Sequence, residues 1–302
     1  MNKSLRKGRL VAMKYDAPIY RPPSEAYSLI IQVTLGCTYN KCTFCSAFQS
    51  KTFRVRSMDD IKADLKEARE IYPSVEKIFL ADGDSLILPT SYLLEILIYI
   101  RELFPECQRI GTYGSPRAIN LKTVDELKKL KKNGLGIVYM GLESGNDEVL
   151  RFVNKGVNSL EMVTAGRKIK ESGIPLSITV ISGLGGRARI KEHAIDTARV
   201  LNQIDPEYVG LLTLILVEGT VMYIQRQSGE FSVLTPKEIM METKLMLQEL
   251  DLTDCVFRAN HASNYLPLKG TLPKDKPMLI EMLNKALTSS DDVFKSEEYR
   301  FL

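Results

Sequence analysis

Short apolar runs alternate with longer amphipathic stretches along most of this chain. The runs are rich in β-branched residues, which is typical of strands, and the stretches between them repeat apolar positions at helical spacing. This pattern predicts strands over residues 29–34, 77–81, 109–112, 136–140, 176–181 and 208–216. It predicts helices over residues 59–71, 92–104, 123–132, 160–172 and 190–203. Gly134 and Gly173 follow two of these helices, where a C-terminal capping glycine is expected.

Alternation of strands with helices is typical of parallel β/α units. We therefore predict an α/β fold in which residues 27–220 form a partial (β/α)6 TIM-like barrel. Residues 1–26 are expected to form an N-terminal arm. Residues 221–302 are expected to form a C-terminal helical extension that caps the barrel, with helices near 236–250 and 276–287. The segment 258–268 is rich in loop-forming residues and is expected to be either a structural turn or a cap over the barrel mouth.

The residues that follow the predicted strands are small, acidic or reactive. Such clusters follow all six predicted strands, at Cys37 and at residues 82–84, 113–116, 143–145, 183–186 and 218–220. In parallel barrels the functional groups gather at the carboxyl ends of the strands. The sequence therefore predicts one site, built by several loops at one rim of the barrel.

Cysteines are concentrated in one of these loops. Cys37, Cys42 and Cys45 lie within nine residues, whereas Cys107 and Cys255 are isolated. Three soft thiolates on a flexible loop suit a 4Fe–4S cluster and leave one iron open to bind a small molecule. The spacing therefore favours an iron–sulfur site, and the two isolated cysteines are expected to be small buried hydrophobic residues.

Other uses of the three thiols are less favoured. A zinc knuckle needs a fourth nearby cysteine or histidine, but His193 and His261 are both distant in sequence. A disulfide pair would suit a secreted protein, whereas this sequence starts without an apolar leader. Clustered free thiols therefore predict a cytoplasmic location, with zinc and inert or redox-active thiols as the alternatives to iron–sulfur.

Charge and hydropathy narrow the classes of partner. The net charge is +4, and part of the basic surplus lies between Lys3 and Lys14. A solvated terminal arm is favoured for this run over a contact with nucleic acid. The longest apolar stretch, near residues 86–100, is interrupted by polar residues and does not reach the ~20 apolar residues of a membrane span. We therefore expect a small-molecule substrate and no membrane.

Several motifs resemble those of the radical S-adenosylmethionine (SAM) enzymes, over roughly residues 29–220. They are the three cysteines with Phe44 between the last two, the acid-Gly-acid turn at 82–84, Gly-Leu-Glu-Ser-Gly at 141–145 and Gly-Leu-Gly-Gly at 183–186. The resemblance is greatest to the subset that contains oxygen-independent coproporphyrinogen oxidase, the methylthiotransferases and the elongator-type acetyltransferase. The family usually spaces its cysteines Cys-x3-Cys-x2-Cys, whereas the first gap here holds four residues.

The resemblance implies two cofactors, a 4Fe–4S cluster bound by Cys37, Cys42 and Cys45, and SAM. The open iron would bind the amino nitrogen and carboxylate of SAM. One electron from a donor such as flavodoxin or ferredoxin would then cleave SAM to methionine and a 5′-deoxyadenosyl radical. The implied activity is hydrogen abstraction from an unidentified small organic substrate. A methylthiotransferase is disfavoured, because Cys107 and Cys255 do not suffice for a second cluster.

The resemblance also implies which residues contact SAM. The backbone of Gly83 would approach the methionine amino group and Asp84 would accept from that ammonium, whereas Asp82 is expected to cap the following helix. Phe44 would pack near adenine or anchor the loop as a core aromatic, and Glu143 would bind ribose hydroxyls or form a buried structural ion pair. Ser144 would contact the methionine carboxylate, and Thr179 would contact the ribose. The backbones of Gly183 and Leu184 would contact adenine.

Two further functions are compatible with the same motifs. A haem-binding chaperone would keep the cluster without turnover and would use His261 as its haem ligand. An RNA-modifying radical SAM enzyme would use the basic residues at 3–14. Nucleic acid is the less favoured partner, because the sequence lacks a basic surface interleaved with aromatic residues.

Overall fold

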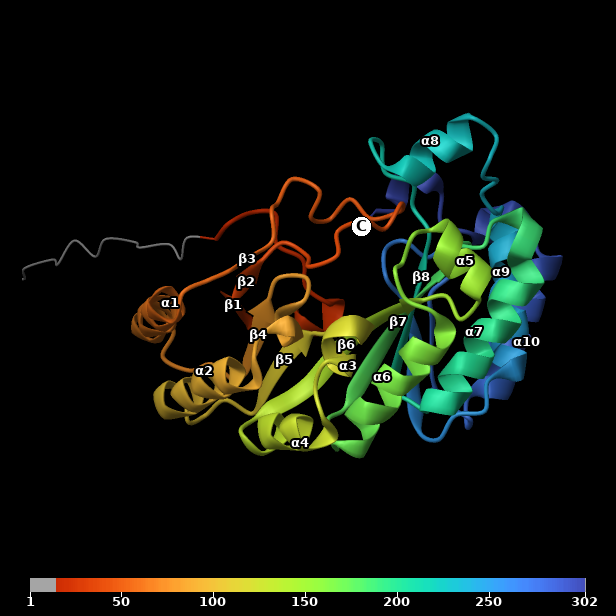
Figure 1. Ribbon diagram of the computed structural model, residues 1–302. Helices are drawn as coiled ribbons and strands as arrows, with labels where there is room; N and C mark the ends of the chain where they lie inside the picture. The colour runs from red at the N-terminus through yellow and green to blue at the C-terminus, as the bar shows by residue number, and fades with distance from the viewer. Residues whose placement is uncertain (1–14, 302) are drawn as a thin grey trace, which may run out of the picture.

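The computed structural model describes residues 15–301, and an eight-stranded sheet runs through its centre (Figure 1). The strands lie in the order β1-β4-β5-β6-β7-β8-β9-β10. Every neighbouring pair from β1 to β9 is parallel, and β10 pairs antiparallel with β9. Their bounds are β1 Leu29–Gln32, β4 Lys77–Ala81, β5 Arg109–Tyr113, β6 Leu135–Glu143, β7 Leu176–Ser182, β8 Tyr208–Thr213, β9 Cys255–Ala259 and β10 Leu268–Leu272. The first six of these are the predicted strands, so the predicted α/β partial barrel is confirmed.

The larger helices lie on the outside of the curved sheet (Figure 1). Reciprocal capping boxes at Thr123, Asn158 and Thr235 define the starts of α4, α6 and α9. Gly134 and Gly173 have positive φ angles just after α4 and α6, which confirms their predicted role as caps. The helices are α1 Met58–Ile71, α2 Thr90–Leu103, α3 Pro116–Asn120, α4 Val124–Lys132, α5 Asp147–Phe152, α6 Ser159–Glu171, α7 Ile190–Ile204, α8 Val221–Gln227, α9 Pro236–Glu249 and α10 Lys276–Thr288.

Alternating positions of the strands face two different apolar layers. In β4, Ile78 and Leu80 belong to the large core between the sheet and the helices, whereas Phe79 and Ala81 belong to a smaller cluster with Ile30, Ile137 and Tyr139. Because successive side chains of a strand point to opposite faces, this second cluster marks the inner face of the barrel. Tyr113 packs against it, with its ring centroid 5.0 Å from that of Phe79 in an edge-on arrangement.

The C-terminal extension differs from the expected helical cap, because β9 and β10 continue the sheet. Segment 258–268 therefore contains the end of β9, the connecting loop and the start of β10. These strands were missed because each has only five residues and both adjoin a run of loop-forming residues. Helix α9 packs against α7, and α10 packs against α9 and β10.

The described part of the N-terminal arm, from residue 15, packs against the barrel. Glu25 is fully buried and accepts hydrogen bonds from Arg109 at 2.6 Å and from the Tyr139 hydroxyl at 2.5 Å. Asp16 bonds through its backbone to Gln32 at 2.9 and 3.0 Å. The predicted boundary at residue 27 therefore separates segments that share one set of buried contacts. The basic run from Lys3 to Lys14 lies outside the described residues.

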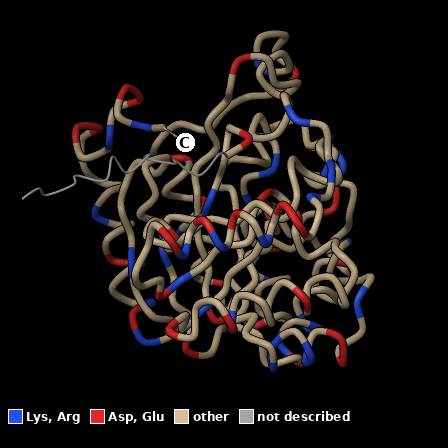
Figure 2. Tube along the Cα trace, turned by 90° about the vertical axis from the view of Figure 1, so that its left-hand side faces the viewer, with Lys and Arg blue, Asp and Glu red and all other residues tan. Residues whose placement is uncertain are grey.

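Acidic and basic residues are interspersed along the described chain, including its helices (Figure 2). Within residues 15–301, no helix is both long enough and apolar enough to span a bilayer.

The buried Glu25 is expected to be a major contributor to stability. Removing one partner of a buried ion pair leaves the other charge uncompensated, so Glu25→Ala should lower the free energy of unfolding by about 3 kcal/mol. Glu281→Ala, which removes an exposed partner of Lys285 on one helix, should leave it nearly unchanged. Urea titrations of both variants test this, and equal effects would show that the Glu25 pair is not a stabilising element.

Candidate functional site

The three clustered cysteines lie on one loop at the carboxyl end of the first strand. A short hairpin of β2 (Thr34–Leu35) and β3 (Arg54–Val55) brackets this cysteine loop, residues 36–53. The side chains of Cys37, Cys42 and Cys45 are half-buried. Burial is the main cause that raises the pKa of Cys42, to about 11, and Cys37 and Cys45 add to it. The loop therefore carries three partly buried thiols beside the end of β1.

Asp82 ties the two ends of the cysteine loop together. Its fully buried carboxylate accepts from the Gly36 N–H at 3.0 Å and from Lys51 Nζ at 2.9 Å, while its second oxygen accepts from Gln32 at 3.0 Å. The expectation that Asp82 caps the following helix is therefore wrong. The N-cap position of the 3-10 helix at Ser85–Ile87 is Asp84, and no side chain caps this helix.

Asp84 is also a structural acceptor. Its fully buried carboxylate accepts from the Thr38 hydroxyl at 2.5 Å and from both the N–H and the hydroxyl of Ser115 at 2.8 Å. Burial raises the pKa of Asp84, and these hydrogen bonds oppose that effect. The carboxylate thus links the cysteine loop to the start of α3. Its expected contact with the methionine ammonium stays a prediction.

Gly83 lies where no larger residue fits. A Cβ atom there would be 2.6 Å from the Phe48 ring and 3.2 Å from Cys37 Cβ, so the absence of a side chain lets the strand end approach the cysteine loop. The expected approach to the methionine amino group stays a prediction.

The segment after α5 holds the other side of the cysteine loop. The Val153 carbonyl accepts from the Thr43 N–H at 3.0 Å, and the Asn154 side chain bonds to the Tyr39 hydroxyl at 2.8 Å and to the Lys41 carbonyl at 3.0 Å. These contacts were not predicted from the sequence. The only local signal for them is the turn-forming Asn-Lys-Gly at residues 154–156, in which Asn154 and Gly156 have positive φ angles.

Glu143 ends β6 in an unusual conformation. Its φ of +64° is in the left-handed region, and the β6–β7 register shifts between Gly141 and Glu143, as in a bulge that redirects a side chain. The carboxylate folds back over Gly141, where a Cβ would be only 2.1 Å from its Oε1. Lys155 donates to that oxygen at 3.0 Å, and both side chains are mostly buried. This is the ion pair expected as the alternative role, and the ribose contact stays a prediction.

Ser144, the residue after Glu143, is held by a separate set of hydrogen bonds. It is fully buried, its hydroxyl is 2.8 Å from His193 Nδ1, and it accepts from the Asn146 N–H at 3.0 Å. His193 Nε2 lies 3.1 Å from the Ile181 carbonyl, so its N–H donates there and Nδ1 accepts from Ser144. Ser144 thus connects the ends of β6 and β7 through His193, and its expected contact with the methionine carboxylate stays a prediction.

The loop after β7 is held by hydrogen bonds within the chain. The Gly183 N–H donates to buried Glu242 at 2.7 Å, and the Leu184 N–H donates to the Ile181 carbonyl at 3.4 Å. Any backbone contact with adenine would therefore use the carbonyl groups. Thr179 is half-buried on the face of β7 opposite the helix-packed residues, so it faces the barrel interior. Its ribose contact stays a prediction.

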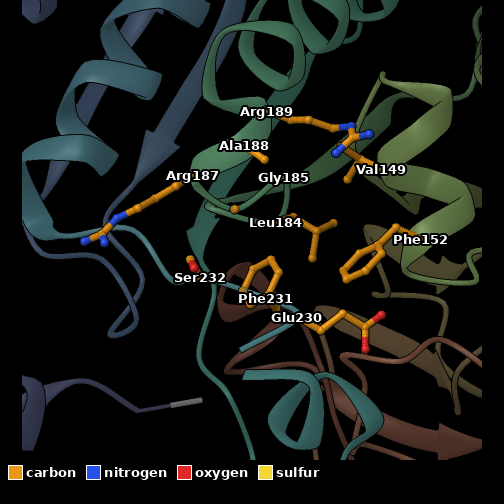
Figure 3. Close-up of a pocket in the computed structure, with 11 residues that line it drawn as sticks. Val149, Phe152, Leu184, Gly185, Arg187, Ala188, Arg189, Glu230, Phe231 and Ser232 are labelled. Atoms are coloured by element: carbon orange, nitrogen blue, oxygen red, sulfur yellow. The ribbon is translucent and has the colours of Figure 1, made fainter. Parts of the chain in front are cut away.

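Leu184 also lines a cavity of about 410 Å³ between α5, the loop after β7 and residues 230–232. Figure 3 shows Leu184, Phe152 and Phe231 gathered at this cavity. The two phenyl rings are nearly parallel, with centroids 6.0 Å apart. Phe44 packs against the same apolar cluster, as expected for a core aromatic, while its adenine contact stays a prediction.

The two remaining cysteines and His261 belong to other segments of the fold. Cys255 is buried in the main core and Cys107 packs against that core, which confirms that they are hydrophobic residues. His261 is half-buried in the loop after β9, where its Nδ1 contacts Ser263 at 3.0 Å. Burial is the main cause that lowers the pKa of His261.

The donor set of the cysteine loop fits a 4Fe–4S cluster. Among residues 15–301, no group of three or more His, Cys, Asp or Glu side chains is placed to hold a single metal ion. In a cubane each thiolate binds a different iron, so its ligands stand farther apart than those of one ion. Thr43 Oγ1, between two of the cysteines, is buried without a hydrogen-bond partner, and a cluster sulfide would provide its acceptor.

Charge near the thiols comes from two opposing groups. Burial is the first cause of the raised pKa of Cys45, Glu143 raises it further and Lys155 lowers it. The Lys155 ammonium therefore favours thiolates, which are the form that binds iron. These groups bring a cationic side chain, a carboxylate and three thiols to one rim.

Comparisons with known proteins agree on the kind of domain. The chain is 28% identical over 203 residues to 7,8-dihydro-6-hydroxymethylpterin dimethyltransferase of Methanocaldococcus jannaschii, covering 63% of this chain and 38% of that protein. It is 24% identical over 168 residues to the haem chaperone HemW of Bacillus subtilis, covering 55% of this chain and 43% of that protein. The matches thus span less than half the length of either relative.

A solved structure shares the fold. Coproporphyrinogen III oxidase (HemN) from Escherichia coli, described as a radical SAM enzyme, superposes with a TM-score of 0.53 at 19% identity. The match covers 74% of this chain and 52% of that chain. The sequence model of the radical SAM superfamily matches residues 31–200 of the 302. This range includes the cysteine loop and Glu143. This chain therefore belongs to the radical SAM superfamily.

Proposed function

We propose that this radical SAM enzyme uses a 4Fe–4S cluster to cleave SAM reductively and to abstract hydrogen from a small organic substrate. When bound, the reduced cluster supplies the electron that breaks a carbon–sulfur bond of SAM, giving methionine and a 5′-deoxyadenosyl radical that takes the hydrogen atom. The observation that carries this proposal is the gathering of Cys37, Cys42 and Cys45 on one loop beside Glu143 and Lys155.

The residues of this chain would hold, orient and shield the reacting groups. The three cysteines would bind the cluster, and Glu143 would hold a hydroxyl or an amino group of SAM. The inner face of the barrel, with Phe79, Tyr113 and Tyr139, would accommodate the substrate and exclude water. An electron donor such as flavodoxin or ferredoxin is part of the proposal.

A haem-binding chaperone is the second candidate, and the position of His261 favours it. Parallel strand β9 ends at Ala259, so His261 lies at the same edge of the sheet as the cysteine loop. The similarity to a haem chaperone supports this candidate further. An RNA-modifying enzyme is a third proposal. The basic residues between Lys3 and Lys14 that it would use lie outside the residues that the structure describes.

The three-ligand assignment predicts a clear division among the five cysteines. Cys37→Ser, Cys42→Ser or Cys45→Ser should remove most of the iron taken up on anaerobic reconstitution, because a hydroxyl oxygen is a poor ligand for these clusters. Serine at Cys107 or Cys255 should leave the iron content unchanged. Iron and sulfide analysis of all five variants tests this, and equal loss at all positions would contradict it.

Reductive cleavage predicts a specific product. The reconstituted protein, reduced with dithionite and given SAM under anaerobic conditions, should release 5′-deoxyadenosine, and Cys42→Ser should not. Liquid chromatography of the quenched reaction measures the product. A stable cluster that yields none, even with cell extract as a source of substrate, would reject the enzymatic proposal.

A Soret band that appears on haem addition and is lost in His261→Ala would then support the chaperone.

Glu143 is expected to contribute to SAM binding. Glu143→Gln should retain the cluster but weaken SAM affinity about tenfold, because a hydrogen bond to a charged group contributes about 1.5 kcal/mol or more. Glu148→Gln on α5, whose carboxylate pairs with Arg189 and is exposed, is the matched control and should bind SAM normally. Equilibrium dialysis with labelled SAM distinguishes the two, and normal affinity in Glu143→Gln would leave Glu143 only its ion pair.

A further inference from the structure

The inner face of the barrel carries two contrasting groups of side chains. On β4–β6 an aromatic wall is formed by Phe79, Tyr113 and Tyr139, whose rings pack edge to face. On β7–β10 four residues without large apolar side chains are consecutive partners in the strand register, so they form one row across the sheet. This polar row consists of Thr179 (β7), Gly210 (β8), Arg258 (β9) and Lys269 (β10).

The polar row faces the interior of the barrel. Each of its members adjoins, along its own strand, a residue of the core between the sheet and the helices; these neighbours are Ile178, Val209, Phe257 and Leu268. Because alternate side chains of a strand point to opposite faces, the row lies on the inner face. Its two cationic residues are exposed and its other two members are half-buried. The row is therefore open to a molecule that enters the barrel.

The two cations of the row have no acidic partner within the described chain. The Lys269 side chain makes no hydrogen bond or ion pair among residues 15–301. Arg258 Nη1 donates to two backbone carbonyls, those of Phe257 at 2.8 Å and Gly270 at 3.1 Å, which carry no charge. Other cations already pair with three buried carboxylates of the barrel, those of Glu25, Asp82 and Glu143. Since like charges directly opposite each other destabilise a sheet, this arrangement costs stability.

Gly210 leaves empty space in the middle of the row. A Cβ there would have one neighbour within 4 Å, the Ile178 carbonyl oxygen at 3.9 Å. Gly210 is not among the glycines with a positive φ, so its backbone does not require glycine. A glycine inside a strand weakens the strand and often marks a place where a ligand approaches closely. The space over Gly210 is next to Arg258 and is large enough for a side chain.

The row begins beside the candidate SAM site. Thr179 pairs in register with Gly141 of β6, over which the Glu143 carboxylate folds. Arg258 and Lys269 are two and three strands away from Thr179, which corresponds to roughly 10 and 14 Å at about 4.8 Å per strand. A small organic molecule can span this distance, with one end on the cations and the other near Glu143.

We propose that the polar row binds an anionic group of the substrate, a carboxylate or a phosphate, and that the aromatic wall accommodates an apolar part of the same molecule. The Arg258 guanidinium is already anchored through Nη1, and its remaining N–H groups are free to donate to an anion. Lys269 adds a second positive charge. The inference rests on the proposed function, because it names the class of substrate that would react in the barrel.

Three probes of similar shape test the charge requirement: benzoate, phenyl phosphate and the neutral benzamide. Each is titrated by saturation-transfer NMR into the full-length reconstituted protein, with the cluster oxidised and SAM present so that the site of the SAM carboxylate is filled. At least one anion should bind about tenfold more tightly than benzamide, because hydrogen bonds to charged groups are among the stronger ones. The tighter of the two anions distinguishes a carboxylate from a phosphate. Equal affinity for all three probes would overturn the proposal.

Four variants locate the binding. Arg258→Met and Lys269→Met should each weaken anion binding about tenfold without changing benzamide binding. Both should melt no lower than the wild type, because each removes one of two opposed like charges. Gly210→Val should fold normally, since valine suits a strand, and should block the anion by filling the space beside Arg258. Lys285→Met is the matched control, since exposed Lys285 lies on α10 and pairs with Glu281, and it should bind the anion normally.

Two outcomes of the variant series would overturn the proposal. One is unchanged anion affinity in Arg258→Met. The other is loss of affinity in both charge variants together with normal affinity in Gly210→Val, which would show that the anion binds exposed charges outside the barrel interior. Arg258→Lys, which keeps the charge, should retain more affinity than Arg258→Met and serves as a check if the methionine variant does not fold.

The outcomes also separate this inference from the proposed function. A wild-type protein that releases 5′-deoxyadenosine but binds no anion would reject only the role of the polar row. A wild-type protein that binds the anion through the row but never cleaves SAM would keep the anion site and reject the proposed reaction.

Discussion

The buried carboxylate of Asp82 closes the cysteine loop, and the geometry of the site depends on it. It accepts from the backbone of Gly36 at the start of the loop and from Lys51 near its end. A loop of this length loses considerable conformational entropy when its ends are joined. A buried charged acceptor with several donors offsets that cost, because an unpaired carboxylate in the interior would be far less stable. Closing the loop on the end of β4 also fixes where the thiols lie relative to the sheet.

Two buried polar networks lie at opposite ends of the parallel strands. Glu25 and Arg109 meet where β5 begins, and they join the N-terminal arm to the barrel interior. Asp82, Asp84 and Glu143 all lie at carboxyl ends, with the thiols. Both networks contain buried charges, but only the second surrounds a loop with three thiols. Burial of charge alone therefore does not identify the site; its position along the strands does.

The first six strands of the large sheet and the cysteine loop were predictable because their signals are local. Runs of β-branched residues and the spacing of three cysteines need no knowledge of distant residues. The roles of Asp84 and Ser144 were not predictable, because a polar residue at a strand end is equally compatible with binding a ligand and with binding Thr38, Ser115 or His193. Lys155 was missed for a related reason. A lysine in a turn is usually solvated, and only the fold brings it to Glu143.

The longer first gap between the cysteines can be understood from the same contacts. An added residue gives the loop more conformations, so fewer of them present the thiols together. In this chain the gap contains Tyr39 and Asn40, and both are restrained. Tyr39 packs on Gly156 and bonds to Asn154, while Asn40, with a φ of +48°, donates to the Phe48 carbonyl at 2.8 Å. The turn after α5 thus limits the freedom that the added residue introduces, which couples the unusual spacing to the segment that carries Lys155.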